Sequence, residues 1–277
     1  MNQVMKNKIE TYINLFFQPV ASSVRYAIDY NMPIQFDSGS FGEGLICISQ
    51  DTKGSGTQGG ASFDTSAGDE VKTLFFFQSK ECTKEGCKYK NSFFTKNCNK
   101  CGHTGFKYAK DTRAGIACDS HFDYFKDLRN YYIIEIKPTS YDPSCREAKI
   151  IGWIIKKDNT FFNSLLKVQK NNGTCHKNLL TSSVEFKMCA PSKFLEAKVD
   201  FSDSVKSNVV LLNEDYNTNT VEHIKEDLWK RQYRKWRPHA GQNYDPVINK
   251  LEIVAISGTH GKKRGNVVRK NKLRRTS

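Results

Sequence analysis

Three charged residues near position 70 have the types and the spacing that phosphodiester hydrolysis requires. In the segment GGASFDTSAGDEVKT, which spans residues 59–73, Asp64 precedes Glu70 by six positions and Lys72 follows Glu70 by two. On an extended strand Glu70 and Lys72 point to the same face, and Asp64 can meet them from the preceding turn. The two carboxylates and the Val71 carbonyl would form an oxygen-rich site for Mg²⁺. Lys72 could then orient or help to deprotonate the attacking water, while the metal neutralises charge on the phosphodiester.

This segment resembles the active-site motif of the PD-(D/E)XK nuclease superfamily. Its short Asp-to-Glu spacing is similar to the branch that holds the mismatch-repair nicking enzyme MutH and related type II restriction endonucleases. The resemblance covers roughly residues 40–80, and the rest of the chain only in general layout. One departure is Phe63, which stands where the family usually has a proline before the Asp.

The resemblance implies a restriction-endonuclease-like core sheet flanked by helices. It also implies that Asp64 and Glu70 are Mg²⁺ ligands and that Lys72 lies next to the attacking water. Many members add a glutamate from an upstream helix, for which Glu43 and Glu10 are candidates; Glu43 is preferred because it lies nearer the loop in sequence. The implied activity is Mg²⁺-dependent cleavage of both strands of duplex DNA at a short site. The implied partners are a DNA methyltransferase that protects the same site and, for a palindromic site, a second copy of the chain.

Two other interpretations of these residues remain open. Asp69, Glu70 and Lys72 could be a solvated turn before a core strand. A second Glu-x-Lys pair, Glu135 and Lys137, ends the strand-like run YYIIEIKP, and three acidic residues lie upstream of it: Asp119, Asp123 and Asp127. We favour the first site because its glycine-rich approach suits backbone that must pass near DNA.

The elements that would position these residues alternate between helix and strand, which predicts a mixed α/β fold in a single domain over residues 1–277. Three-to-four spacing of apolar residues predicts a helix over residues 2–30, which Pro19 could kink or split. The glycine-rich segment 37–68 predicts a mobile loop or backbone close to a ligand. We expect strands at 71–78, 131–136, 149–155, 209–212 and 251–256, and short helices at 120–128 and 161–168.

Four of the nine cysteines have the spacing of a zinc site. Cys82, Cys87, Cys98 and Cys101 form C-x4-C-x10-C-x2-C, which suits a tetrahedral Zn²⁺ site in an insertion at about residues 80–104. Four thiolates leave no open position for substrate, so the metal would be structural. The insertion resembles a zinc ribbon. It could contact DNA through basic residues such as Lys88 and Lys90, or serve only as a structural clip.

The charge of the chain favours a polyanionic partner, most simply nucleic acid. Of the formal net charge of +14, residues 222–277 contribute +10, from 15 Lys and Arg against 5 Asp and Glu. The end at about 262–277 is predicted to be a basic arm that binds phosphates or only adds solubility. Candidate DNA contacts are Arg113 and His121, the cluster Arg231, Arg234 and Lys235, and Lys262, Lys263 and Arg264 in the arm.

Several classes of protein are disfavoured. No apolar run reaches the length of a membrane helix, and the first residues lack a signal-peptide pattern. The cysteine usage fits a reducing cytoplasm better than a disulfide framework. Residues 258–264 lack the spacing of a nucleotide-binding P-loop, which argues against ATP hydrolysis. The alternatives to a restriction enzyme are a zinc-containing DNA- or RNA-binding protein without catalysis and a repair endonuclease that nicks one strand.

Overall fold

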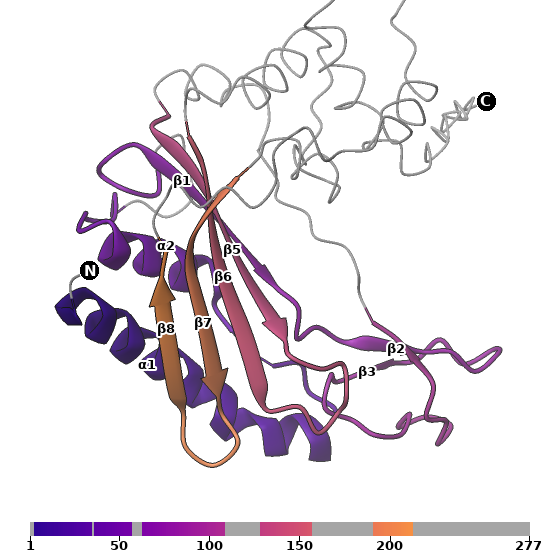
Figure 1. Ribbon diagram of the computed structural model, residues 1–277. Helices are drawn as coiled ribbons and strands as arrows, with labels where there is room; N and C mark the ends of the chain where they lie inside the picture. Colours follow the sequence, from indigo (N-terminus) through magenta and orange to yellow (C-terminus); the bar gives the residue numbers. More distant parts are fainter. Residues whose placement is uncertain (1–2, 35, 57–62, 109–127, 157–190, 213–277) are drawn as a thin grey trace, which may run out of the picture.

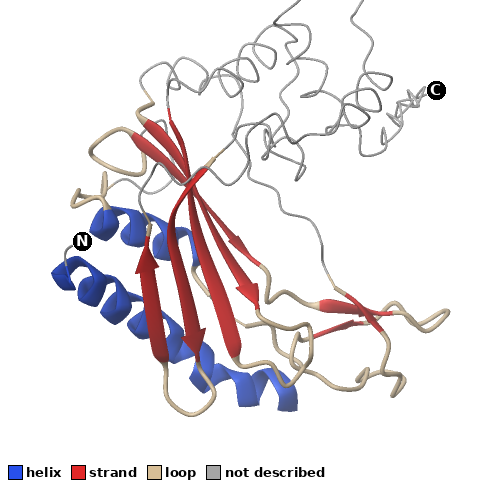
Figure 2. Cartoon of the chain, in the orientation of Figure 1, coloured by secondary structure: helices blue, strands red, loops and turns tan. Residues whose placement is uncertain are grey.

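The computed structural model describes residues 3–34, 36–56, 63–108, 128–156 and 191–212. Within these ranges the chain forms two helices, a five-stranded sheet and a small three-stranded sheet (Figures 1 and 2). The mixed α/β class predicted from the sequence is confirmed. The bounds are α1 Gln3–Asp29, α2 Ser38–Ser49, β1 Asp69–Phe75, β2 Lys80–Cys82, β3 Lys90–Asn91, β4 Phe106–Lys107, β5 Asn130–Pro138, β6 Glu147–Lys156, β7 Ser192–Asp200 and β8 Lys206–Leu211.

The large sheet is mixed, with the strand order β1-β5-β6-β7-β8. Strand β1 pairs with β5 in parallel, and the following pairs are all antiparallel. A parallel pair requires a long crossover connection, and residues 76–129 supply it. The small sheet, of order β3-β2-β4, lies within this connection. It projects from the end of the large sheet that is remote from the start of β1 (Figure 1).

Both helices cover one face of the large sheet (Figure 2). The buried stripe of α1 follows three-to-four spacing, as predicted: Ile9, Ile13, Phe17, Val20, Val24 and Ala27. It packs on alternating sheet residues such as Ile134, Ile150 and Val199, and these form one core. Pro19 does not split α1, which runs as a single helix from Gln3 to Asp29. Within the described part of the chain, no helix combines the length and the apolar character that a membrane span requires.

Within the glycine-rich segment 37–68, residues 38–49 form α2, so the prediction of a mobile loop was wrong for this part. The Asp37 side chain caps this helix by accepting a hydrogen bond from the Ser40 N–H at 3.1 Å. Two of its glycines allow close packing: a Cβ on Gly42 would lie 1.9 Å from Thr73 Oγ1, and a Cβ on Gly44 would lie 2.0 Å from the Tyr12 hydroxyl. These glycines therefore bring α2 close to β1 and α1.

Four of the predicted strands are present as β1, β5, β6 and β8, with ends shifted by one to three residues. Strand β7 was not predicted, although Leu195, Ala197 and Val199 alternate and are buried. Its lysines and glutamate obscure this pattern in the sequence. The predicted helix at 120–128, apart from Leu128, lies outside the described residues, as do the predicted elements at 161–168 and 251–256 and the proposed basic arm at 262–277.

Candidate active site and metal centre

Asp64, Glu70 and Lys72 meet at the start of β1. The Val71 N–H donates a hydrogen bond to Asp64 Oδ2 at 2.7 Å, which holds the carboxylate against the outer edge of the strand. The Lys72 ammonium donates to Glu70 Oε1 and, at 3.3 Å, to the Val71 carbonyl oxygen. A cationic group thus already lies against two of the three oxygen groups that the sequence predicted as metal ligands. The donor set at this edge suits a cation.

The electrostatic surroundings of Asp64 are unusual for a carboxylate. Burial, together with the nearby charges of Glu70 and Glu43, raises the pKa of Asp64 to about 6, although the Val71 hydrogen bond and Lys72 oppose the shift. The influence of Glu43 places it, on α2, in the neighbourhood of Asp64. Glu10 lies elsewhere: its side chain accepts a hydrogen bond from Val209 N on β8, at the opposite edge of the sheet. Of the two upstream glutamates, Glu43 alone is therefore near the candidate site.

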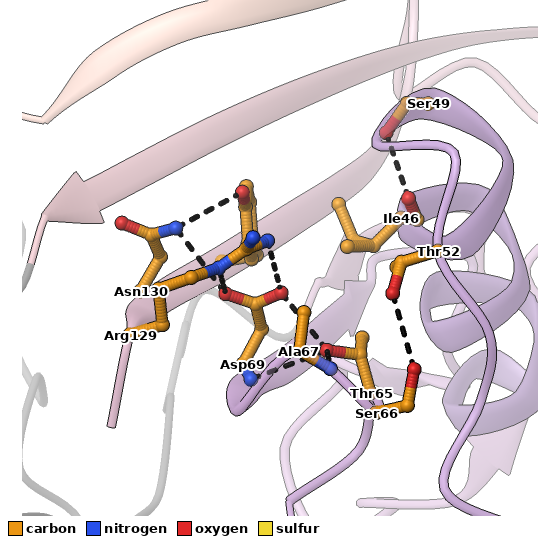
Figure 3. A network of polar contacts seen from close by, with 10 residues as sticks. Ile46, Ser49, Thr52, Thr65, Ser66, Ala67, Asp69, Arg129 and Asn130 are labelled. Atoms are coloured by element: carbon orange, nitrogen blue, oxygen red, sulfur yellow. Dashed lines mark hydrogen bonds and ion pairs between the residues drawn. The ribbon is translucent and has the colours of Figure 1, made fainter. Parts of the chain in front are cut away.

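Asp69 and Glu70 are the first two residues of β1 and are buried, which overturns the interpretation of these residues as a solvated turn. Asp69 is 0% exposed and Glu70 is 9% exposed. Asp69 faces Arg129, which donates from Nε and Nη2 at 2.9 and 2.7 Å, and Thr65 also donates to it (Figure 3). This network was missed in the sequence because Arg129 is 60 positions away and only the β1–β5 pairing brings it close.

The second Glu-x-Lys pair is a self-contained group on β5. Glu135 is buried, and its Oε2 accepts a hydrogen bond from Trp153 Nε1 at 3.1 Å and forms an ion pair with Lys137 Nζ at 2.8 Å. These contacts satisfy the carboxylate within the sheet. The three acidic residues predicted to accompany it (Asp119, Asp123 and Asp127) lie outside the described residues.

The four predicted cysteines converge, and their sulfur atoms all lie within 4.8 Å of one another. The Cys82–Cys101 and Cys87–Cys98 sulfur pairs are each 3.7 Å apart. Tetrahedral zinc with Zn–S bonds of about 2.3 Å places its sulfurs about 3.8 Å apart, whereas a disulfide would require about 2.05 Å. The cluster can therefore hold a metal ion such as zinc.

The cysteine cluster is supported by the main body of the fold. Phe93 and Phe94, between the two cysteine pairs, are each 1% exposed and belong to the main hydrophobic core. Asn31, just beyond α1, accepts from Ser92 N at 2.8 Å and donates to the Lys90 carbonyl at 3.2 Å. The insertion is therefore anchored to the main core through Phe93, Phe94 and Asn31.

Carboxylates do not form a comparable cluster. Among the described residues, one group of at least three His, Cys, Asp or Glu side chains has ligand atoms close enough to share a metal ion, and it consists of the four cysteines. A cation at β1 would therefore rely on two carboxylates and a main-chain oxygen. Of the predicted DNA contacts, Lys88 and Lys90 are exposed on the insertion. The other eight lie outside the described residues: Arg113, His121, Arg231, Arg234, Lys235, Lys262, Lys263 and Arg264.

Comparison of this chain with models of known protein families, with curated proteins and with solved structures finds no match.

Proposed function

We propose that this protein is a metal-dependent endonuclease that hydrolyses duplex DNA at a specific site, in the manner of type II restriction endonucleases. The observation that carries the proposal is the meeting of Asp64, Glu70 and Lys72 at the start of β1, with Asp64 Oδ2 held 2.7 Å from Val71 N. A lysine beside two partly buried carboxylates and a strand-edge carbonyl is the set of groups that metal-assisted phosphodiester hydrolysis requires.

Each residue has a definable part in this reaction. Asp64, Glu70 and the Val71 carbonyl would hold Mg²⁺, which supplies charge neutralisation at the phosphate when bound. Lys72 would orient the attacking water with the ammonium that now contacts Glu70 and Val71. Glu43 adds negative charge near Asp64, and the resulting field favours a cation at this edge. Because burial raises the pKa of Asp64 to about 6, protonation of its carboxylate competes with cation binding below that pH.

The partner that best fits the chain is double-stranded DNA. The net charge of +14 favours a polyanion, and Lys88 and Lys90 present exposed cations on the insertion. Zn²⁺ in the cysteine cluster would have a structural role, since four thiolates complete its coordination. A DNA methyltransferase that modifies the same site would protect the host, and a dimer would match a palindromic site.

A second function is favoured by one specific observation. The four cysteines form a complete metal-ligand set among the described residues, whereas the carboxylates at β1 do not. A zinc-containing nucleic-acid-binding protein without catalysis would have this arrangement.

The experiment that separates these functions is incubation of unmethylated phage DNA and supercoiled plasmid with the purified protein, in Mg²⁺ or in EDTA. Discrete fragments that form only with Mg²⁺ would support the endonuclease. Nicked plasmid without linear product would indicate a nicking enzyme. Intact DNA that is retarded in a native gel under both conditions would favour the binding protein and contradict the proposal.

A further inference from the structure

An arginine held by a buried aspartate lies at the end of the sheet where the candidate active site forms. Arg129 donates from Nε to Asp69 Oδ1 at 2.9 Å and from Nη2 to Asp69 Oδ2 at 2.7 Å. This is the two-point geometry that arginine forms with carboxylates. The aspartate is 0% exposed, whereas 47% of the Arg129 side chain is exposed. The pair therefore joins a buried anion to a cation at the surface.

The aspartate is completely engaged by its neighbours, so the position of the arginine is fixed. Besides Arg129, Asp69 Oδ1 accepts from Asn130 Nδ2 at 3.2 Å, and Oδ2 accepts from Thr65 Oγ1 at 2.9 Å (Figure 3). The Arg129 N–H also donates to the Gly68 carbonyl at 2.7 Å. Asp69 thus has no remaining oxygen to offer a metal ion, and its role is to anchor the guanidinium.

Among the described residues, the partners of the anchored guanidinium leave donors for a second anion. A guanidinium carries five N–H groups; the ion pair with Asp69 uses two of them, and the Tyr132 side chain is a further hydrogen-bond partner. The hydrogen bond with Asp69 also raises the pKa of Arg129, so the side chain stays charged. An arginine fixed in this way loses little side-chain freedom when it binds a ligand.

The position of Arg129 relates it to the carboxylates of the candidate site. In the β1–β5 register Asp69 lies opposite Asn130 and Glu70 lies opposite Tyr131. Arg129 therefore lies at the same end of the parallel pair as Asp64 and Glu70, although its partner Asp69 points to the face of the sheet opposite to Glu70 and Lys72. A phosphate approaching two carboxylates is repelled unless cations accompany it, and a fixed arginine at this end would offset that repulsion.

We propose that Arg129 is a phosphate-contact residue, held by Asp69 so that its outer edge binds a phosphate of the DNA backbone at the end of the sheet that carries the candidate active site. The proposal rests on the proposed function in that it takes DNA as the ligand. It goes further by assigning a contact residue that the sequence did not reveal. The competing interpretation is that Arg129 and Asp69 only join β1 to β5.

The test compares two variants that both lack the buried carboxylate, since Arg129→Gln alone would leave Asp69 unpaired and could unfold the protein. Asp69→Asn keeps the arginine, and the double variant Asp69→Asn/Arg129→Gln removes it. Binding of each to a fluorescent 30-base-pair duplex is measured by anisotropy in EDTA, over a series of salt concentrations. Arg25→Gln is the matched control, because Arg25 is an exposed arginine 3.6 Å from Asp29 on α1.

If Arg129 contacts a phosphate, the slope of log affinity against log salt becomes shallower by about 0.9 between the single and the double variant. The ratio of the single variant's affinity to the double variant's affinity should therefore be about eightfold larger at 0.1 M salt than at 1 M salt. Arg25→Gln should leave the slope unchanged.

Equal slopes for the single and double variants would overturn the proposal, even if the wild-type protein cleaves DNA. A shallower slope for the double variant would support it even if the wild type binds DNA without cleaving, an outcome that contradicts only the endonuclease. Absence of DNA binding by the wild type would contradict both.

Discussion

Metal binding by the cysteine cluster should stabilise the whole domain and not only the insertion. The perturbation is Cys98→Ser, which removes one of the four ligands. Phe93 and Phe94 lie five and four positions before Cys98, and each ring is 1% exposed. Phe94 contacts Phe77 and Phe201, with ring centroids 6.0 and 6.4 Å apart. Loss of the metal should therefore release these rings from the main core.

The magnitude follows from the burial of the two rings. Truncation of one buried phenylalanine to alanine costs about 3–5 kcal/mol, so release of even one ring should lower the free energy of unfolding by that order. Typical domains have a total of about 5–15 kcal/mol. With an m value of about 2 kcal/mol per molar urea, the midpoint should fall by about 1.5–2.5 M.

The assay is urea denaturation followed by far-ultraviolet circular dichroism, with metal release followed by a chromophoric chelator. We expect both signals to change in one coincident transition, and Cys98→Ser to shift it. Cys47→Ser is the matched control, because Cys47 on α2 lies outside the cluster. Metal release that leaves the circular dichroism transition unmoved would refute the reasoning, since the insertion would then be an independent unit.

Three further predictions concern stability. The pKa of Asp64 is raised to about 6 in the folded state, against about 3.9 in the unfolded chain. The protonated Asp64 therefore makes its full contribution to the free energy of unfolding below about pH 4, and this contribution is lost as the pH rises through about 6. Asp64→Asn should therefore gain stability relative to wild type between pH 4 and 7.5, by the order of 1 kcal/mol after solvent screening; equal melting-temperature differences at both pH values would contradict this. Gly44→Ala should cost about 1–3 kcal/mol because the new Cβ meets the Tyr12 hydroxyl at 2.0 Å, whereas Gly39→Ala, whose Cβ meets its nearest atom at 3.6 Å, should not destabilise α2 in the same urea assay. Asn31→Gly keeps the left-handed backbone (φ 53) but removes two hydrogen bonds to the insertion; we expect a loss of about 1–2 kcal/mol in urea, and an unchanged midpoint would show that Asn31 does not join α1 to the insertion.

Short-range patterns allowed most of the candidate site and of the helix–strand order to be predicted. The apolar spacing of α1 and the buried runs of β5 and β6 reflect periodicities that the core imposes directly. The cysteine cluster was predictable because the ligand spacing of a metal site is local. Asp64, Glu70 and Lys72 also lie within nine positions of one another, so a single strand and its turn suffice to assemble them.

Features that depend on tertiary contacts were not predictable from the sequence. Glycines in a helix cost about 1 kcal/mol each relative to alanine, so the glycine-rich α2 was taken for a loop. The structure shows that Gly42 and Gly44 are needed for close packing, and the cap by Asp37 was the local signal that was overlooked. The Arg129–Asp69 pair depends on a parallel pairing of strands that lie far apart in the chain. No local pattern indicates such a contact.

The central claim is that Asp64, Glu70 and Lys72 form a site for metal-dependent hydrolysis of DNA. The most direct measurement is the single-turnover cleavage rate of unmethylated DNA in Mg²⁺ by Lys72→Ala and by Lys137→Ala, beside wild type. The two lysines occupy equivalent places in the two Glu-x-Lys pairs, and each contacts its glutamate. We predict that Lys72→Ala abolishes cleavage but still binds DNA, whereas Lys137→Ala cleaves at nearly the wild-type rate. Loss of cleavage only in Lys137→Ala, or no cleavage by the wild type, would contradict the claim.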